Sequence, residues 1–175
     1  MQGKIVLITG STSGIGQASA DLFESKGWRV VATSRRERET RVLSDVRLQV
    51  YLDTLKPDSF EPALETVRSH WGEPDVLINN AGYALMGPLE GWGETQWREQ
   101  VETNLMAPVR LMQLVLPGMR RKGWGSIVNV TSIGGRIAFP FTSAYHATKF
   151  ALEGLTEGCR FELSASGVKV ALVEP

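Results

Sequence analysis

Short apolar runs rich in β-branched residues alternate along the chain with longer stretches of helical periodicity. Three runs, Ile5–Ile8, Val76–Ile78 and Ile127–Val130, are nearly continuous, which is typical of strands buried on both faces of a parallel sheet. Strands that alternate with helices form βαβ units, so the pattern predicts an α/β fold. The predicted strands are Lys4–Thr9, Arg29–Ser34, Arg47–Leu52, Asp75–Asn79, Ser126–Thr131 and Val168–Val173, and the predicted helices are Gly14–Lys26, Ser59–His70, Glu94–Arg121 and Ser143–Ser164.

Glycines mark the ends of three predicted helices, at Gly27, Gly72 and Gly123. There is no internal repeat, low-complexity tract or linker, and 175 residues can form one domain with its own core. We therefore expect a single domain over residues 1–175. The chain reaches Pro175 directly after an apolar strand, where a doubly wound sheet is usually covered by further chain. We also expect the protein to continue beyond this residue.

Charge and composition argue against several classes of protein, including nucleic-acid-binding, membrane and metal-binding proteins. Nineteen basic residues balance nineteen acidic ones, and the chain has no polybasic run, so neither a nucleic acid nor a membrane is an expected partner. Cys159 is the only cysteine and cannot form an internal disulfide, which favours a reducing compartment and a cytoplasmic protein. No apolar run is as long as a membrane span. Two scattered histidines and one cysteine offer no metal-ligand cluster, so no metal is expected.

A glycine-rich turn follows the first predicted strand and precedes the first helix. It contains Gly10, Ser13, Gly14, Ile15 and Gly16. Glycines permit a tight turn that brings backbone N–H groups close to a phosphate, and the helix N-terminus adds partial positive charge. The spacing is a variant of the G-x-G-x-x-G dinucleotide fingerprint. The turn therefore predicts a dinucleotide site, while a plain β-α turn is the alternative.

The tip of the second predicted strand carries arginines where NAD-binding folds usually place an acid. Arg35 and Arg36 follow Ser34, and guanidinium groups suit the 2′-phosphate of NADP. We therefore expect NADP(H) to be favoured over NAD(H). The alternative is that residues 35–39 are a solvated, self-paired charge run.

Tyr145 and Lys149 lie four residues apart in a predicted helix and so share one face. A tyrosine phenol has a pKa of about 10 and becomes a base near neutral pH only where positive charge lowers that pKa. Ser132 lies just past a predicted strand, at the sheet edge where open α/β folds bind ligands. A Tyr-x-x-x-Lys spacing alone is common on protein surfaces. Together with Ser132 and the glycine turn, it predicts a proton-transfer site.

Asn104 precedes Pro108 by four residues in the third predicted helix. Proline has no N–H, so a helix that continues through Pro108 leaves the Asn104 carbonyl without its usual partner. That carbonyl would then be available to a water molecule. The alternative is that the helix simply breaks at Pro108.

These motifs together resemble the short-chain dehydrogenase/reductase family, single-domain branch. The match consists of the cofactor turn Thr9, Gly10, Gly14, Ile15 and Gly16, the motif Asn79, Asn80, Ala81 and Gly82, the adenine-contacting acid Asp53, and the catalytic set Asn104, Ser132, Tyr145 and Lys149. Tyr145 follows Ser132 by thirteen positions, as in the family. The resemblance covers the whole chain.

The resemblance implies a Rossmann-type doubly wound sheet with six parallel strands in the order 3-2-1-4-5-6 and helices on both faces. It also implies an NAD(P)-dependent oxidoreductase. Tyr145 would be the general acid or base, Lys149 would hold the nicotinamide ribose, Ser132 would hold the substrate oxygen, and Asn104 would anchor a relay water. Family members pair through helices equivalent to Glu94–Arg121 and Ser143–Ser164, which implies a homodimer or homotetramer. In the family a substrate-covering segment and a last strand follow the position of Pro175.

Apolar residues cluster in two predicted loops at the sheet edge. Ile137, Phe139 and Phe141 lie between Ser132 and Tyr145, and Leu85 and Met86 follow the asparagine motif. We expect a small-molecule substrate whose reacting end is apolar, a hydrophobic ketone or secondary alcohol rather than a sugar. The alternative is that these side chains only cover the sheet. Two competing functions remain open, a cofactor sensor without turnover and a catalytically incompetent fragment. A Rossmann-type methyltransferase is weaker, because it needs neither the Tyr-Lys pair nor the arginines.

Overall fold

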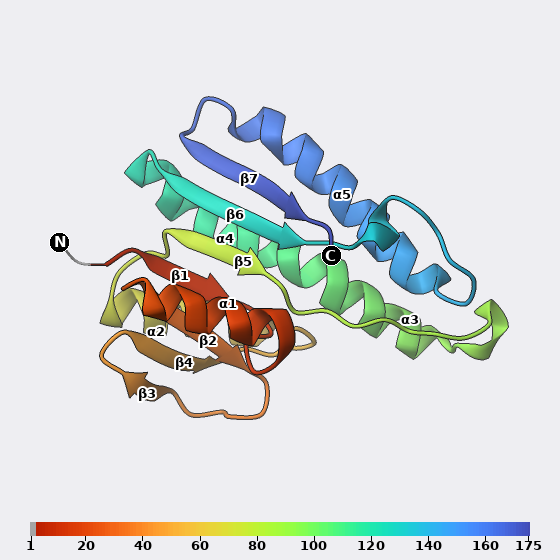
Figure 1. Cartoon of the computed structure of the whole chain (residues 1–175), viewed down its shortest axis with the longest axis horizontal. Coiled ribbons are helices and arrows are strands. Elements are labelled where there is room, and N and C mark those ends of the chain that lie inside the picture. The colour runs from red at the N-terminus through yellow and green to blue at the C-terminus, as the bar shows by residue number, and fades with distance from the viewer. Residues whose placement is uncertain (1–2) are drawn as a thin grey trace.

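A sheet of seven strands forms the middle layer of the computed structural model, which describes residues 3–175 (Figure 1). The strands are β1 Ile5–Ile8, β2 Arg29–Ser34, β3 Arg41–Ser44, β4 Arg47–Tyr51, β5 Val76–Asn79, β6 Gly125–Val130 and β7 Val168–Val173. They lie in the order β3-β4-β2-β1-β5-β6-β7. All neighbours pair in parallel except β3 and β4. The six expected strands therefore have the expected order, which confirms the doubly wound α/β class.

The sheet changes its direction of winding at β1. This strand pairs on one side with β2 and on the other side with β5. From β1 the chain first builds the half of the sheet that contains β2, and then crosses to β5 and builds the other half. Because the connections diverge there, a crevice opens beyond the carboxyl ends of β1 and β5. The glycine turn and Asn80 follow these two strand ends. The strand order thus brings together two motifs that lie about 70 residues apart in the sequence.

The seventh strand, β3, was not expected from the sequence, and the prediction of six strands is corrected here. It pairs antiparallel with β4 at the sheet edge, with a register shift between Val42 and Ser44. The side chains of Val42 and Leu43 are 68% and 50% exposed. An edge strand without a buried face has no alternation of apolar and polar residues, so the hydrophobic pattern contains no signal for it.

Helices cover both faces of the sheet, as expected. Helix α1 (Gly14–Ser25) packs on one face against Val6, Ile8 and Val30 and lies in front of the sheet in Figure 1. The opposite face carries the larger core, to which α2 (Phe60–His70), α4 (Ala107–Lys122) and α5 (Ser143–Leu163) contribute. Successive residues of β1 alternate between the two cores, because side chains of a strand point to opposite faces.

The long predicted helix Glu94–Arg121 is helical along its whole length but changes its winding in the middle. It consists of α3 (Glu94–Val101), a π-helical turn (Glu102–Met106) and α4, which ends where Gly123 adopts φ +66°. Pro108 cannot donate a hydrogen bond one turn back, and the wider turn directly precedes it. The helix therefore does not break at Pro108, and the alternative of a break is wrong. Asn104 lies within the π turn.

Candidate active site

A cavity of about 860 Å³ opens at the carboxyl edge of the sheet. Most of the predicted site residues line it, namely Gly10, Ser13, Ile15, Arg35, Asn80, Ala81, Gly82, Ser132, Tyr145 and Lys149. Gly14, Gly16, Arg36, Asp53 and Asn104 are not part of its lining. The cavity thus joins the glycine turn at one end to the Tyr145–Lys149 pair at the other, although these motifs come from opposite halves of the chain.

The glycine turn is built so closely that side chains would not fit in two places. A Cβ on Gly10, which has φ +63°, would lie 2.8 Å from the Cα of Ala81. A Cβ on Gly16 would lie 2.3 Å from the carbonyl oxygen of Gly10 and 2.4 Å from the amide nitrogen of the Asn80 side chain. Gly14 also has a positive φ, +54°, with open space around it. Ser13 and Ile15 line the cavity at the N-terminus of α1, and the glycines beside them carry no side chain, which fits a bound pyrophosphate.

Polar bonds connect this turn to the end of β5. The side-chain amide of Asn80 donates to the carbonyl oxygens of Thr9 and Gly10, at 2.9 and 3.1 Å. The Thr9 hydroxyl in turn accepts from the backbone N–H groups of Asn80 and Ala81, both at 3.0 Å. Thr9 was part of the quoted motif but not of the predicted site. The Thr9 hydroxyl bonds to a residue 71 positions away, so the only sequence signal for its role is its position next to the glycine turn.

The two arginines after β2 are free of competing carboxylates. Within residues 3–175 no carboxylate oxygen lies within 4.0 Å of the guanidinium group of Arg35 or Arg36, whereas Glu37 pairs with Arg41 at 3.4 Å. Arg35 lines the cavity, and the backbone N–H of Arg36 donates to Ser34. The charge run is therefore not self-paired at the two positions that matter for an anionic ligand.

Asp53, the predicted adenine contact, is engaged in local structure. Its carboxylate accepts from the backbone N–H of Leu55 at 3.1 Å, in the turn that follows β4. Its neighbours Leu52 and Thr54 line the cavity, while Asp53 itself does not. The residue thus shapes the turn beside the cavity, and an adenine contact from its side chain stays a prediction.

Tyr145 and Lys149 point into the cavity from α5, as their spacing predicted. The Lys149 ammonium lies 5.6 Å from the centroid of the Tyr145 ring and donates to the carbonyl oxygen of Val130 at 2.8 Å. The side chain is only 5% exposed. Burial lowers the pKa of Lys149 to about 8, and the negative charge of Glu153 opposes that shift. Ser132 joins this pair from the end of β6.

Asn104 does not line the cavity but holds Tyr83, which does. Its side chain accepts from the backbone N–H of Tyr83 at 3.2 Å and donates to the Tyr83 carbonyl at 2.9 Å and to the Thr148 hydroxyl at 3.2 Å. Gln100, which sequence reasoning missed, is fully buried and bonds the same loop at Tyr83 and Leu85. The two amides hold the loop after β5 against α3 and α5. Nothing in the sequence distinguishes Gln100 from other glutamines of a polar helix.

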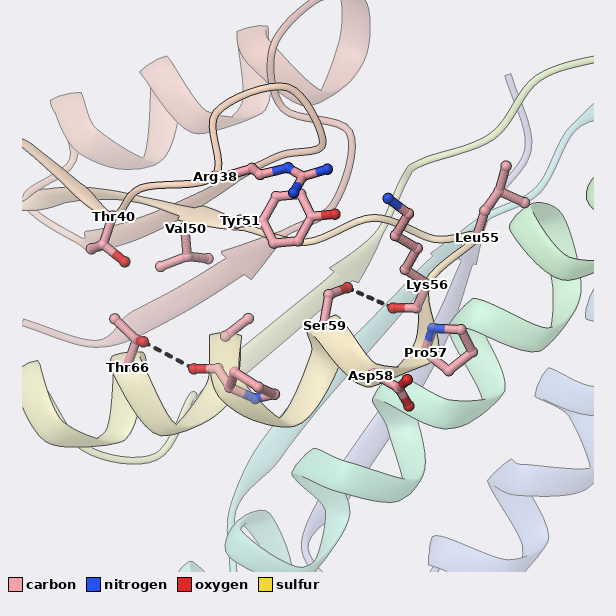
Figure 2. A pocket seen from close by; sticks show the side chains of 12 residues that line it. Arg38, Thr40, Val50, Tyr51, Leu55, Lys56, Pro57, Asp58, Ser59 and Thr66 are labelled. Atoms are coloured by element: carbon pink, nitrogen blue, oxygen red, sulfur yellow. Dashed lines mark hydrogen bonds between the residues drawn. The ribbon is translucent and has the colours of Figure 1, made fainter.

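A second cavity, of about 560 Å³, lies between β4 and α2 (Figure 2). Figure 2 shows that two hydroxyls in its wall are already engaged, since Ser59 donates to the Lys56 carbonyl at 2.7 Å and Thr66 to the Pro62 carbonyl at 2.9 Å. Its lining contains none of the predicted site residues, all of which the structure describes. The larger cavity is therefore the candidate active site.

Between residues 3 and 175 no three histidine, cysteine, aspartate or glutamate side chains gather in a way that could hold a metal ion. No helix in that range combines the length and apolar composition needed to cross a membrane.

Known proteins resemble this chain along almost its entire length. The short chain dehydrogenase family model matches residues 4–175. A 3-ketodihydrosphingosine reductase of Bacteroides thetaiotaomicron is 39% identical over 175 residues, which are all of this chain and 64% of the relative. The chain thus spans about two thirds of that relative's length.

Two solved structures add fold-level matches with bound cofactors. A metagenomic short-chain oxidoreductase in complex with NADP superposes with a TM-score of 0.90 at 31% identity, over 100% of this chain and 83% of that one. A 4-hydroxyisoleucine dehydrogenase complexed with NADH superposes with a TM-score of 0.89 at 29% identity, over 99% and 75%.

The close approach at Gly16 leads to a stability prediction. Gly16→Ala should lower the free energy of unfolding by about 1–3 kcal/mol, because the new methyl group overlaps the Gly10 carbonyl and the Asn80 amide. Gln17→Ala leaves alanine at the next, exposed position of α1 without adding an atom there, and should change the free energy by less than about 0.5 kcal/mol. Urea unfolding measures both. Equal stability of the two variants would contradict the close packing of this turn.

Proposed function

The chain belongs to the short-chain dehydrogenase family, and we propose that it acts as an NAD(P)-dependent oxidoreductase that interconverts a secondary alcohol and a ketone. One observation carries the proposal: the glycine turn and the set of Ser132, Tyr145 and Lys149 line the same cavity. A dinucleotide site without chemistry would need only the first of these. The chain spans 64% of the length of its 39% identical relative, so this activity is proposed for the protein of which these residues form the cofactor-binding part.

The cavity fits a nicotinamide dinucleotide. The turn packs so closely at Gly10 and Gly16 that no side chain fits there, and the N-terminus of α1 offers backbone N–H groups to a pyrophosphate. Lys149, at the other end, offers an ammonium group to the hydroxyls of a ribose. When bound, the cofactor supplies or accepts the hydride. The residues of this chain supply placement and proton transfer.

Tyr145 is the proposed proton donor to the ketone oxygen in reduction and the proton acceptor from the alcohol in oxidation. The ammonium of Lys149 lies beside the tyrosine ring, 5.6 Å from its centroid. The Ser132 hydroxyl is proposed to donate a hydrogen bond to the substrate oxygen and so to hold it against Tyr145. The Asn104 carbonyl, within the π turn, is proposed to anchor a water that continues the proton relay from Lys149.

An apolar substrate is proposed from the exposed side chains of the two loops that follow β5 and β6, of which Leu85 lines the cavity. Met86, Ile137, Phe139 and Phe141 are between 49% and 69% exposed, and the backbone N–H of Gly87 donates to the Phe141 carbonyl at 2.7 Å, which joins the two loops. A 39% identical relative is named for the reduction of 3-ketodihydrosphingosine. A hydrophobic ketone gains free energy by covering these side chains, which a sugar cannot do.

Replacement of Tyr145 tests the reaction. Tyr145→Phe should lower the rate of NADPH-dependent ketone reduction at least about 100-fold, because it removes the proton donor and leaves the ring in place. Cofactor affinity should stay within about threefold of the wild-type value. Oxidation of NADPH, followed by absorbance with 3-ketodihydrosphingosine and with a monosaccharide as substrates, measures the rates.

The matched control is Tyr51→Phe, which removes a phenol from the wall of the second cavity. This variant should keep the wild-type rate. Undiminished turnover in Tyr145→Phe would refute the proposed proton donor. Equal turnover of the sugar and the lipid ketone by the wild type would refute the apolar substrate alone.

A preference for NADP(H) is proposed from the unpaired arginines after β2. Replacement of both Arg35 and Arg36 by glutamine should weaken NADPH binding about 10- to 100-fold, since hydrogen bonds to charged groups contribute about 1.5–3 kcal/mol. NADH binding should change little. Arg38→Gln, a variant of the same charge run whose side chain lines the second cavity, is the control. Titrations followed by tryptophan fluorescence compare the affinities. Tighter binding of NADH than NADPH by the wild type would overturn the preference.

A homodimer or homotetramer is proposed through α5 and α4. Phe150 and Phe161 of α5 are 46% and 81% exposed, and Ala147, Ala151 and Gly158 of the same helix are exposed as well. An apolar helix face of this kind is stabilised by pairing with a second copy. Sedimentation should show an oligomer that Phe161→Glu dissociates, whereas a monomeric wild type at micromolar concentration would contradict the pairing.

A further inference from the structure

A chain of ion pairs that the proposed reaction does not use lies one helical turn from Lys149. Glu153 follows Lys149 by four residues on α5 and is 5% exposed. Its carboxylate is 3.1 Å from the guanidinium of Arg136, which also donates to the Glu174 carboxylate at 2.9 and 3.3 Å. Residues i and i+4 of a helix are neighbours on one face. Glu153 therefore lies between two cations, Lys149 and Arg136.

The burial of Glu153 is costly unless its charge is compensated. Within residues 3–175 neither of its carboxylate oxygens has a well-aligned hydrogen bond, so the contact with Arg136 is an ion pair. A Cβ on Gly135 would lie 2.9 Å from Cγ of Glu153, which shows how closely the backbone of the turn covers this side chain. A buried carboxylate loses its hydration and is stabilised only by nearby positive charge. The two cations supply that charge.

Arg136 is rigidly connected to Ser132. A single turn of 3₁₀-helix joins them, with Gly135 N–H donating to the Ser132 carbonyl at 2.8 Å and Arg136 N–H to the Ile133 carbonyl at 2.9 Å. Glu174 follows β7, which pairs with β6 directly before Ser132. The ion pairs thus join the Ser132 turn, α5 and the end of β7, which are the elements that surround the proposed substrate oxygen.

We propose that Arg136 and Glu153 are positioning residues of the proposed oxidoreductase, whose ion pair holds the Ser132 turn against α5 and keeps Lys149 protonated during turnover. The inference rests on the proposed function, in which Ser132 orients the substrate oxygen and Lys149 acts as a cation. Neither Arg136 nor Glu153 needs to touch substrate or cofactor. Arg136 holds the Glu153 carboxylate in place, and Glu153 in turn supports the charge on Lys149.

Among the groups around Lys149, Glu153 is the one whose charge favours the protonated ammonium. Burial lowers the pKa of Lys149 to about 8, and Glu153 is the charged group that raises it. The other titratable groups near the pair are Tyr145, His146 and Glu157 on α5 and Glu174 after β7. From β6 the neighbour is the Val130 carbonyl, and the π turn contributes the uncharged Asn104, which bonds Thr148. Glu157 pairs with Arg160 at 2.7 Å, and its charge is the weakest of those that act on Arg136.

Glu153→Gln tests the charge without changing the shape of the side chain. Loss of the carboxylate should lower the pKa of Lys149 by about one unit, because a neighbouring opposite charge no longer favours the ammonium. The alkaline limb of kcat/KM for ketone reduction should move about one pH unit lower, while the rate below the limb should change little. The pH profile and NMR titration of ¹³C-labelled lysines measure the two effects separately.

Arg136 variants test the other half of the ion pair. Arg136→Gln removes the partner that holds the Glu153 carboxylate in place, so its charge is no longer fixed one turn from Lys149 and the alkaline limb should move in the same direction. Amide hydrogen exchange in residues 132–136 should rise about tenfold or more, since the turn loses its anchor. Arg136→Lys keeps a cation and should restore most of both properties. Combining Arg136→Gln with Glu153→Gln should move the limb no further than either variant alone, because both act on one charge.

Glu157→Gln is the matched control, since it makes the same substitution one turn further along α5 in a solvated pair. It should leave the pH profile and the exchange rates at wild-type values. A Lys149 pKa unchanged within about 0.3 units in Glu153→Gln would overturn the inference. Absence of turnover in the wild type would refute the proposed function instead, and the lysine titration and hydrogen exchange would still decide the role of Arg136 and Glu153.

Discussion

The ammonium group of Lys149 is almost wholly removed from water, and the architecture of the site follows from how that charge is accommodated. The Val130 carbonyl at the end of β6 accepts its hydrogen bond, and Glu153 compensates its charge from the next turn of α5. Both partners require α5 to lie against the carboxyl end of β6. A buried cation without these partners would lose its proton or open the structure. The position of α5 is therefore tied to the charge that the site uses.

Buried polar side chains also align α5 with the sheet, through hydrogen bonds that connect β5, β6 and α5. The Asn79 amide of β5 donates to Asn129 of β6 at 2.8 Å, and the Asn129 amide donates to the Thr156 hydroxyl of α5 at 2.9 Å. Apolar contacts tolerate small shifts of one element past another, whereas buried hydrogen bonds have defined geometry and are costly to leave unpaired. This chain of bonds thus fixes how far along β6 the helix lies, and with it the relation of Tyr145 and Lys149 to Ser132.

The two ends of the cavity rely on different physical means. At the end formed by the glycine turn the requirement is steric, because Gly16 must lack a Cβ for the N-terminus of α1 to approach Gly10 and Asn80. At the reactive end the requirement is electrostatic, and charged groups with long side chains meet from the Ser132 turn, α5 and the end of β7. The strand order places these two ends side by side, since β1 lies next to β5 and β5 next to β6.

From the sequence alone, the α/β class, six of the seven strands and ten of the residues that line the cavity could be predicted. These follow from local properties: apolar periodicity, glycines between a strand and a helix, and the i, i+4 spacing of Tyr145 and Lys149. Only the tertiary structure decided the features without a local signal. Strand β3 has no buried face, and Thr9 bonds to backbone groups more than 70 residues away. Glu153 resembles any other helical glutamate in the sequence, and only the fold brings Arg136 next to it. Contacts between segments that are distant in the sequence depend on the packing of the whole sheet, and therefore cannot be predicted from any short stretch of sequence.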